Sequence, residues 1–227
     1  MTKNSEKVIA IIIARGGSKS IPRKNVLPVL GKPLVAWPID LAKSIPRIDR
    51  VIVSSDDDEI MEIAKQHQAE VLFKRPAELS DDQTPTLPVL QHCLKFLREN
   101  ENYTPDIVLL LYPTSPFIKK ERIEQAIDLF ETTDCQSVIS VIEDYGRFWR
   151  ETEGKYKPFY PEQRVNRQYY RPLYRENGAI YFSRYAVLVE MNKIVDEERT
   201  QFLIMAENEN IDIDNPQDLL KAQNQAQ

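Results

Sequence analysis

The chain of 227 residues is long enough for one α/β domain with a sizeable buried core. Its formal net charge of −5 and its pI near 5.3 argue against nucleic acid or an anionic membrane as a general partner. The two cysteines, Cys93 and Cys135, lack metal-ligand spacing, and the apolar run after the polar N-terminus is too short for a signal peptide or a membrane span. We therefore expect a soluble, cytoplasmic protein.

Strand-like apolar runs alternate with helical patterns along the chain. Strands are expected at 8–14, 50–54, 69–73, 107–112, 137–142, 178–183 and 202–213, and helices at about 34–44, 58–67, 86–99, 119–132 and from 216 onward. This alternation is typical of βαβ units and of a largely parallel sheet. We expect a single domain over residues 1–227, with ligands bound beyond the carboxyl ends of the strands.

The first strand leads into a loop that is rich in glycine and positive charge. Two glycines allow positive φ angles and close approach of a ligand to the backbone, and four cations follow within ten residues. The loop residues are Arg15, Gly16, Gly17, Ser18, Lys19, Arg23 and Lys24. The combination suits a polyphosphate, although a basic surface turn explains the same residues. The spacing matches neither a P-loop nor a dinucleotide-binding fingerprint.

Three further stretches follow strands. Asp56 and Glu59 are spaced as a capping box for the helix at 58–67, an interpretation that we prefer to a metal site. The polar loop from Arg75 ends at Thr86, which is suited to cap the next helix. The segment 111–116, bounded by prolines, ends the fourth strand and could line a sugar site.

Residues 144–176 interrupt the alternation of strands and helices. Tyrosines, phenylalanines and one tryptophan are interleaved with arginines and three prolines, and neither helical nor strand periodicity extends over any length. Because unstructured loops longer than about fifteen residues are uncommon in compact domains, we prefer an interface or a binding lid to an ordinary loop.

Two aspartates near the C-terminal end form the second candidate site. In the stretch 210–216, Asn-Ile-Asp-Ile-Asp-Asn-Pro, Asp212 and Asp214 would point to the same face of an extended strand. Adjacent carboxylates repel each other unless a cation lies between them, and Mg²⁺ accepts a few carboxylates together with phosphate oxygens and water. The alternative is that Asp214 caps the helix beginning at Pro216, although Asn215 is the better cap candidate.

The pattern I-I-x-A-R-G-G-S-K-x-I-P-x-K-N at residues 11–25 resembles the N-terminal signature of the acylneuraminate cytidylyltransferases, or CMP-sialic acid synthetases. That family joins CTP to the anomeric oxygen of a nine-carbon 2-keto sugar acid and releases pyrophosphate. The resemblance implies a Rossmann-like α/β nucleotidyltransferase fold with a mostly parallel sheet. It also implies a homodimer formed through residues 144–176.

The resemblance implies roles for individual residues. The catalytic set would be Arg15 and Lys24, which stabilise the triphosphate, together with Asp212 and Asp214, which hold Mg²⁺. The loop residues Ala14, Gly16, Gly17 and Ser18 would bind substrate. Asn25 and Arg75 would orient the nucleotide, and Thr86 would contact it through its hydroxyl. The stretch from Arg75 to Asp82 matches the family's R-P-x-E-L-x-x-D.

For the sugar side, the family usually has Gln-Pro-Thr-Ser-Pro-Leu-Arg where this chain has Tyr112-Pro-Thr-Ser-Pro-Phe-Ile. Because that glutamine contacts the sugar acid in sialate enzymes, Tyr112 makes a legionaminic or pseudaminic acid a serious candidate. The remaining implied substrate-binding residues are Thr114, Ser115, Arg150, Arg167, Arg175, Asn177 and Tyr181. Among these, Arg175 would face the phosphates, and Arg167 and Arg150 would meet the sugar carboxylate.

Two other classes of protein remain open from the sequence. One is a different sugar nucleotidyltransferase, such as a CMP-KDO synthetase-like enzyme or an NDP-sugar pyrophosphorylase. The other is a nucleotide-binding module without catalytic activity, against which the intact carboxylate pair argues. No general base can be named, because neither histidine lies in a candidate site.

Overall fold

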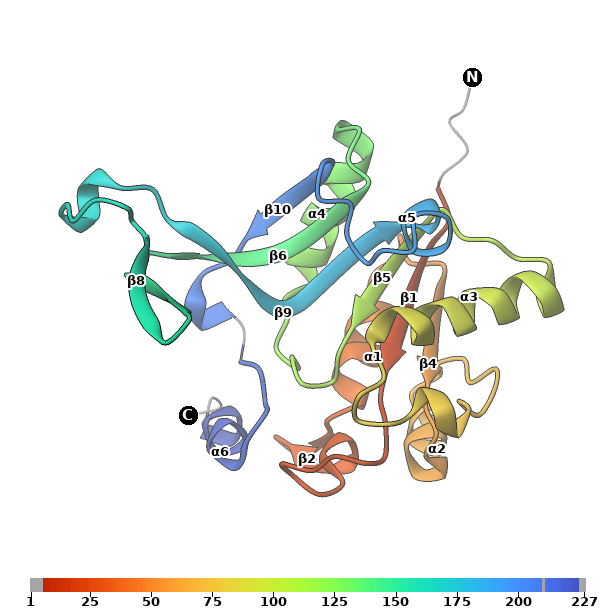
Figure 1. Ribbon diagram of the computed structural model, residues 1–227. Helices are drawn as coiled ribbons and strands as arrows, with labels where there is room; N and C mark the ends of the chain where they lie inside the picture. The colour runs from red at the N-terminus through yellow and green to blue at the C-terminus, as the bar shows by residue number, and fades with distance from the viewer. Residues whose placement is uncertain (1–5, 210, 225–227) are drawn as a thin grey trace.

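The computed structural model describes residues 6–209 and 211–224, and one six-stranded sheet forms its centre (Figure 1). The strand order is β10-β6-β9-β5-β1-β4. The strands are β1 (Val8–Ile13), β4 (Arg50–Ser54), β5 (Ile107–Leu111), β6 (Ser137–Asp144), β9 (Leu173–Arg184) and β10 (Thr200–Ile204). All but β9 run in the same direction, because β9 pairs antiparallel with both β5 and β6. The prediction of a mostly parallel α/β sheet is confirmed.

Helices cover both faces of the sheet. They are α1 (Ala36–Lys43), α2 (Asp58–Gln66), α3 (Thr86–Glu101), α4 (Lys120–Thr132) and α5 (Tyr185–Val189), whereas α6 (Pro216–Asn224) packs in a small core outside the sheet. Alternate residues of β1 enter two different cores. Ala10 and Ile12 pack in the core that includes α1, α2 and α4, whereas Ile9 and Ile11 pack against α3 and α5. A strand buried on both faces explains why the first apolar run is unbroken.

Short elements complete the chain. The hairpin of β2 (Pro28–Val29) and β3 (Lys32–Pro33) lies near α6, and the two share a small core around Val29 and Ile213. Single 3₁₀ turns are η1 (Lys24–Val26), η2 (Ala77–Leu79), η3 (Arg167–Tyr169) and η4 (Glu207–Glu209). No helix in the described ranges is both long and apolar enough to span a bilayer.

Two of the expected strands are wrong. Residues 69–73 form only an isolated bridge, between Glu70 and Ile52, so the segment borders the sheet without joining it. The expected strand at 202–213 ends at Ile204, and residues 211–214 do not pair with any described strand; Asn210 lies outside the described residues. In both cases apolar residues are buried by loop packing, which produces the same pattern as a strand.

The segment 144–176 projects away from the rest of the molecule (Figure 1). It contains a hairpin of β7 (Phe148–Thr152) and β8 (Lys155–Tyr160), which the sequence pattern did not predict. Most residues of both strands are exposed. A strand exposed on both faces needs no alternation of apolar and polar residues, which is why periodicity missed this hairpin.

Candidate active site

A cavity of about 420 Å³ lies at the carboxyl ends of β1 and β5. It brings together residues from opposite ends of the sequence, including Arg15 and Asp214. The polar residues that line it are Arg15, Ser18, Lys19, Ser20, Lys24, Asn25, Arg75, Asp81, Asp82, Thr84, Thr86, Tyr112, Thr114 and Asp214. The position agrees with the rule that open α/β sheets bind ligands beyond their carboxyl ends.

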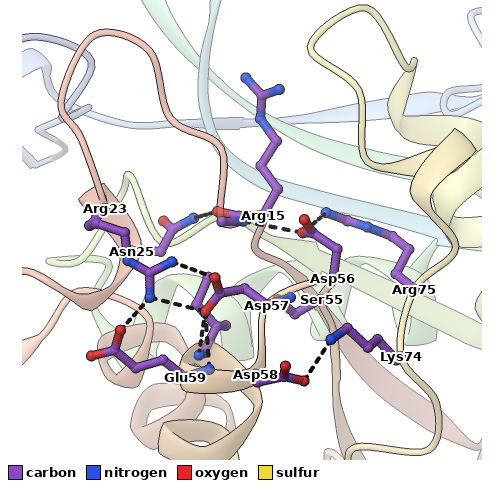
Figure 2. Close-up of polar contacts among 12 residues, drawn as sticks. Arg15, Arg23, Asn25, Ser55, Asp56, Asp57, Asp58, Glu59, Lys74 and Arg75 are labelled. Carbon is purple, nitrogen blue, oxygen red and sulfur yellow. Dashed lines mark hydrogen bonds and ion pairs between the residues drawn. The ribbon is translucent and has the colours of Figure 1, made fainter.

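The glycine loop is fastened by the residues that follow β4 (Figure 2). The Gly16 N–H donates to Asp56 Oδ1 at 3.2 Å, and Asn25 Nδ2 donates to the carbonyl of Arg15 at 2.9 Å. Gly16 and Gly17 do not adopt positive φ angles, contrary to one reason given for them. A Cβ on Gly16 would instead lie 2.6 Å from Asp57 Oδ2, whereas one on Gly17 would meet open space. Gly16 is therefore needed for close packing.

Arg23 anchors the glycine loop to the start of α2 and does not line the first cavity. Its guanidinium pairs with Asp57 and Glu59 at the start of α2 (Figure 2), and these hydrogen bonds raise the arginine's pKa. Asp57 also accepts from the N–H groups of Glu59 and Ile60, at 3.1 and 3.0 Å. The predicted capping box with Asp56 as the cap is wrong, because Asp57 caps the helix while Asp56 turns toward Gly16.

Arg75 is a buried cation at the wall of the cavity. The residue is 3% exposed; its Nη2 lies 3.3 Å from Asp56 Oδ1, and its Nε donates to Ser80 Oγ at 3.0 Å. Burial lowers the pKa of its guanidinium, and the Asp56 carboxylate opposes that shift. Asp56 therefore holds both the glycine loop and the arginine predicted to contact the nucleotide.

Lys24 connects the glycine loop to the C-terminal carboxylates. Its Nζ donates to the carbonyl of Ile213 at 2.8 Å and lies 3.2 Å from Asp214 Oδ1, and its side chain is only 11% exposed. The N–H of Ile213 donates to the carbonyl of Thr114 at 2.8 Å, which ties the same segment to the end of β5. As predicted, Asn215 caps α6, because its Oδ1 accepts from the N–H groups of Gln217 and Asp218.

The side chains of Asp212 and Asp214 point away from the core, because Ile213 between them is fully buried. Burial raises the pKa of the Asp212 carboxyl and the charge of Asp214 raises it further, while a hydrogen bond from Thr114 and the charge of Lys24 oppose the shift. Two neighbouring carboxylates with this mutual repulsion fit a divalent cation that takes its other ligands from phosphate and water. The described residues contain no cluster of three or more acidic, histidine or cysteine side chains arranged for a metal, so a cage made entirely of protein ligands does not fit.

A second cavity of about 650 Å³ includes Asp212 in its lining, whereas Asp214 lines the first. It is lined by Arg175, Asn177, Tyr181 and Asp212, among others. Arg175 Nε lies 3.3 Å from Asp144 Oδ2, and Tyr181 donates its hydroxyl proton to Glu176 at 2.8 Å. Burial, followed by that hydrogen bond, raises the pKa of Tyr181.

Asn177 and Gly178 form an irregular point in β9 beside Asp212. Asn177 Oδ1 accepts from the hydroxyl of Ser140 at 2.6 Å, and Gly178 has a φ of +72°. The register between β6 and β9 shifts at this position. The conformation of Gly178 therefore favours glycine, and Ala179 beside it is fully buried.

Tyr112 and Thr86 contact each other in the lining of the first cavity. Their hydroxyl oxygens lie 2.7 Å apart. Thr86 is the first residue of α3 and makes no capping hydrogen bond, so the capping interpretation is wrong. Thr86 instead lines the first cavity, and its contact with the nucleotide stays a prediction.

Several predicted residues lie outside both cavities. Ala14 and Ser115 are buried, at 1% exposure each, and Ser115 Oγ has no hydrogen-bond partner within 6–209 and 211–224. Arg150 and Arg167 lie on the projecting segment, where they stack on Phe159 and Tyr145. Ala14 supports the loop from beneath through its N–H, which donates to the carbonyl of Ser54 at 3.1 Å.

Sequence reasoning left several residues of this site unassigned. Ser20, Asp82 and Thr84 line the first cavity, and Glu176 lines the second. Asp82 is the final residue of the R-P-x-E-L-x-x-D stretch, so a signal for it was present in the sequence. No local sequence signal marked Glu176, which lines the second cavity from β9.

Comparison with known proteins agrees with this geometry. A CMP:2-keto-3-deoxy-manno-octonic acid synthetase solved in complex with CTP has the same fold, with a TM-score of 0.69 and 16% identity over 96% of this chain and 97% of that chain. The fold is thus that of a nucleotidyltransferase.

Two curated relatives match most of both chains. The pseudaminic acid cytidylyltransferase of Campylobacter jejuni is 33% identical over 218 residues, covering 94% of this chain and 93% of the relative. The CMP-N,N'-diacetyllegionaminic acid synthase of Legionella pneumophila is also 33% identical over 218 residues, with 93% of each chain covered. The family model described as cytidylyltransferase matches residues 9–212. The chain therefore belongs to the cytidylyltransferase family, which confirms the resemblance identified from its first loop.

Proposed function

We propose that the protein activates a nonulosonic acid with CTP. The anomeric hydroxyl of the sugar acid attacks the α-phosphorus, a bond forms between them, and the bond to the β-phosphate breaks to release pyrophosphate. The observation that carries this proposal is the contact between Lys24 and Asp214, which brings the cationic glycine loop and the Asp214 carboxylate into one cavity. The family and the two relatives support CTP as the nucleotide.

The protein's own residues mainly position the reactants and stabilise charge. Arg15, Lys19 and Lys24 contribute fixed positive charge beside the triphosphate and its leaving pyrophosphate. Arg75, held rigidly by burial, and the Thr86 hydroxyl orient the nucleotide from the opposite wall. For the sugar, Arg175 and Tyr181 line the second cavity, where an anionic sugar acid would meet a cation and a hydroxyl.

Asp212 and Asp214 would hold Mg²⁺, because their carboxylate oxygens suit this ion as ligands. When bound, the metal would neutralise phosphate charge and polarise the attacking hydroxyl. Lys24 keeps Asp214 in place through its ammonium group, and Thr114 orients Asp212 through a hydrogen bond.

A pseudaminic or legionaminic acid is the sugar acid that we favour over N-acetylneuraminic acid. Tyr112 replaces the glutamine of the sialate pattern, and its hydroxyl is engaged by Thr86. An aromatic ring there presents less hydrogen-bonding capacity to a hydroxylated sugar than an amide does. Both relatives reported above are named for these two sugar types.

We further propose a cytoplasmic homodimer that forms through residues 144–176. This segment exposes large aromatic side chains, among them Tyr156 at 74% and Tyr169 at 71%. Exposed aromatic residues interleaved with arginine are typical of interfaces. Arg150 and Arg167 would then lie at the contact between the two copies, which is consistent with their distance from the cavities of their own chain. Light scattering coupled to size exclusion measures the mass, and a monomer would exclude the dimer.

One experiment tests the activity. Purified protein is incubated with Mg²⁺, each of CTP, UTP, ATP and GTP, and pseudaminic, legionaminic and N-acetylneuraminic acids in parallel, and pyrophosphate release is measured. Release only with CTP and a nonulosonic acid is expected. Release with another nucleotide would identify a different pyrophosphorylase, and nucleotide binding without release would identify a non-catalytic module.

A further inference from the structure

Asp82 bridges two cations of the glycine loop. Its Oδ1 accepts a hydrogen bond from Arg15 Nη1, and its Oδ2 pairs with Lys19 Nζ, so each carboxylate oxygen serves one cation. All three side chains line the first cavity. Within 6–209 and 211–224, no other carboxylate pairs with Arg15 or Lys19.

The loop that carries Asp82 is anchored on both sides of that residue. Ser80 Oγ accepts from Arg75 Nε and donates to the carbonyl of Pro76, both at 3.0 Å. The N–H of Thr84 donates to the carbonyl of Asp81 at 3.2 Å. Because these contacts fix the backbone independently of the ion pairs, the Asp82 side chain can rotate away from the cations while the loop keeps its conformation.

A carboxylate spanning two cations presents two oxygens, as one phosphoryl group does. Charge-assisted hydrogen bonds from arginine and lysine are satisfied equally by carboxylate and by phosphate. A polyphosphate that uses Arg15 and Lys19 therefore competes with Asp82 for the charge of both groups. A neutral nucleoside takes neither donor and leaves the ion pairs intact.

We propose that Asp82 is a specificity-determining residue that competes with polyphosphate for Arg15 and Lys19. The competition weakens the binding of short or weakly charged phosphate ligands, which cannot displace the carboxylate from both cations. It also promotes the departure of pyrophosphate after transfer, since Asp82 recaptures the two cations. This inference rests on the proposed function in one respect, that the cavity takes the triphosphate of a nucleotide.

The test compares Asp82→Asn with the full-length wild-type protein in calorimetric titrations with inorganic tripolyphosphate, CTP and cytidine at low ionic strength. The amide keeps the size of the side chain and removes the charge. Exposed ion pairs are individually weak, so binding of tripolyphosphate and CTP is expected to tighten by about three- to tenfold. Cytidine affinity is expected to stay the same, and the gain should shrink with added salt.

Glu78→Gln is the matched control. It changes the net charge equally, lies in the same segment, is exposed, and does not line the first cavity. A Lys19→Gln background supplies the second control, because loss of one cation should reduce the effect of Asp82→Asn if the two residues act together. Melting temperatures confirm that all variants are folded.

Equal affinity of Asp82→Asn and wild type for tripolyphosphate would overturn the inference, as would an equal gain in Glu78→Gln. The titration with tripolyphosphate requires neither sugar nor turnover. If Asp82→Asn tightens the binding of tripolyphosphate but the protein releases no pyrophosphate with any sugar acid, this inference stands and the proposed function fails. If the protein is active but Asp82→Asn leaves the affinities unchanged, the proposed function stands and this inference fails.

Discussion

The ammonium group of Lys24 lies 3.2 Å from the Asp214 carboxylate, across 190 positions of sequence. The same group donates to the carbonyl of Ile213, so Lys24 fixes both the backbone and the side chain of the C-terminal carboxylate segment. Since the lysine is mostly buried, its charge acts in a medium less polarisable than water. The two halves of the proposed site are therefore coupled by a direct contact.

Asp214→Asn should lose at least about 100-fold in turnover while the protein stays folded, because charge-stabilising groups at reacting phosphates contribute at least that much. The asparagine oxygen can still accept from Lys24, so the contact survives without the charge. Steady-state pyrophosphate release at several Mg²⁺ concentrations measures the loss. Near-normal activity that still depends on Mg²⁺ would remove Asp214 from the metal site.

Arg15→Ala should lower the rate by about 10²- to 10³-fold, as expected for the removal of a donor that stabilises developing charge. Arg98→Ala provides the control, since Arg98 is an exposed cation on α3. Both variants change the net charge equally. If Arg15→Ala and Arg98→Ala turned over at the same rate, Arg15 would have no part in phosphate stabilisation.

Gly16→Ala and Gly17→Ala should differ in stability. The new methyl group would approach Asp57 Oδ2 to 2.6 Å at position 16, whereas it would enter open space at position 17. Asp57 cannot easily yield because Arg23 and two helix N–H groups hold it. Gly16→Ala should therefore cost about 1–3 kcal/mol of unfolding free energy. Urea denaturation measures both variants, and equal stability would contradict the packing argument.

Tyr112→Phe should raise the KM for CTP by about 3- to 10-fold, because it removes the hydrogen bond that positions Thr86. Thr86→Val should give a similar change, and the double variant should not be additive. Tyr103→Phe is the control. The Tyr103 hydroxyl is buried without a hydrogen-bond partner among the described residues, so its removal should not weaken the protein. Additive effects of the first two variants would show that the hydroxyls act separately.

Glu209 should contribute to stability in a defined pH range. Its two hydrogen bonds from Arg122, at 2.6 and 2.5 Å, lower its pKa from 4.5 to about 2. A carboxylate with a lowered pKa stabilises the fold fully above its unfolded pKa and loses that contribution as the pH falls from about 4.5 to 2.

Arg122→Gln should therefore reduce the unfolding free energy by up to about 1 kcal/mol at pH 6, and the difference from wild type should vanish near pH 2. Urea denaturation across this pH range measures the difference. A difference that did not depend on pH would mean that Arg122 acts through packing alone.

The glycine loop and the carboxylate pair could be predicted because their evidence is local. β1 is an unbroken apolar run since both its faces are buried, and Asp212 and Asp214 alternate with a buried isoleucine. Each of these features can be read from a few consecutive residues.

The incorrect predictions concern features that depend on contacts formed only in the folded chain. Asp56 and Asp57 are adjacent and chemically identical, and the position of Gly16 decides which one caps α2. Thr86 is suited to a cap, but its hydroxyl forms a hydrogen bond with the Tyr112 hydroxyl instead. The direction of β9 depends on pairing with β5 and β6, which lie far away in the sequence.

The Lys24–Asp214 contact also has a consequence for biosynthesis. A ribosome produces Lys24 long before Asp214, so the nascent glycine loop and the sheet that supports it emerge without their C-terminal partner. The cleft is assembled only when the last helix docks against the turn between β2 and β3. If Asp214 serves the proposed reaction, an incomplete chain would lack a working centre, and nucleotide would not be consumed before synthesis of the polypeptide had passed Asp214.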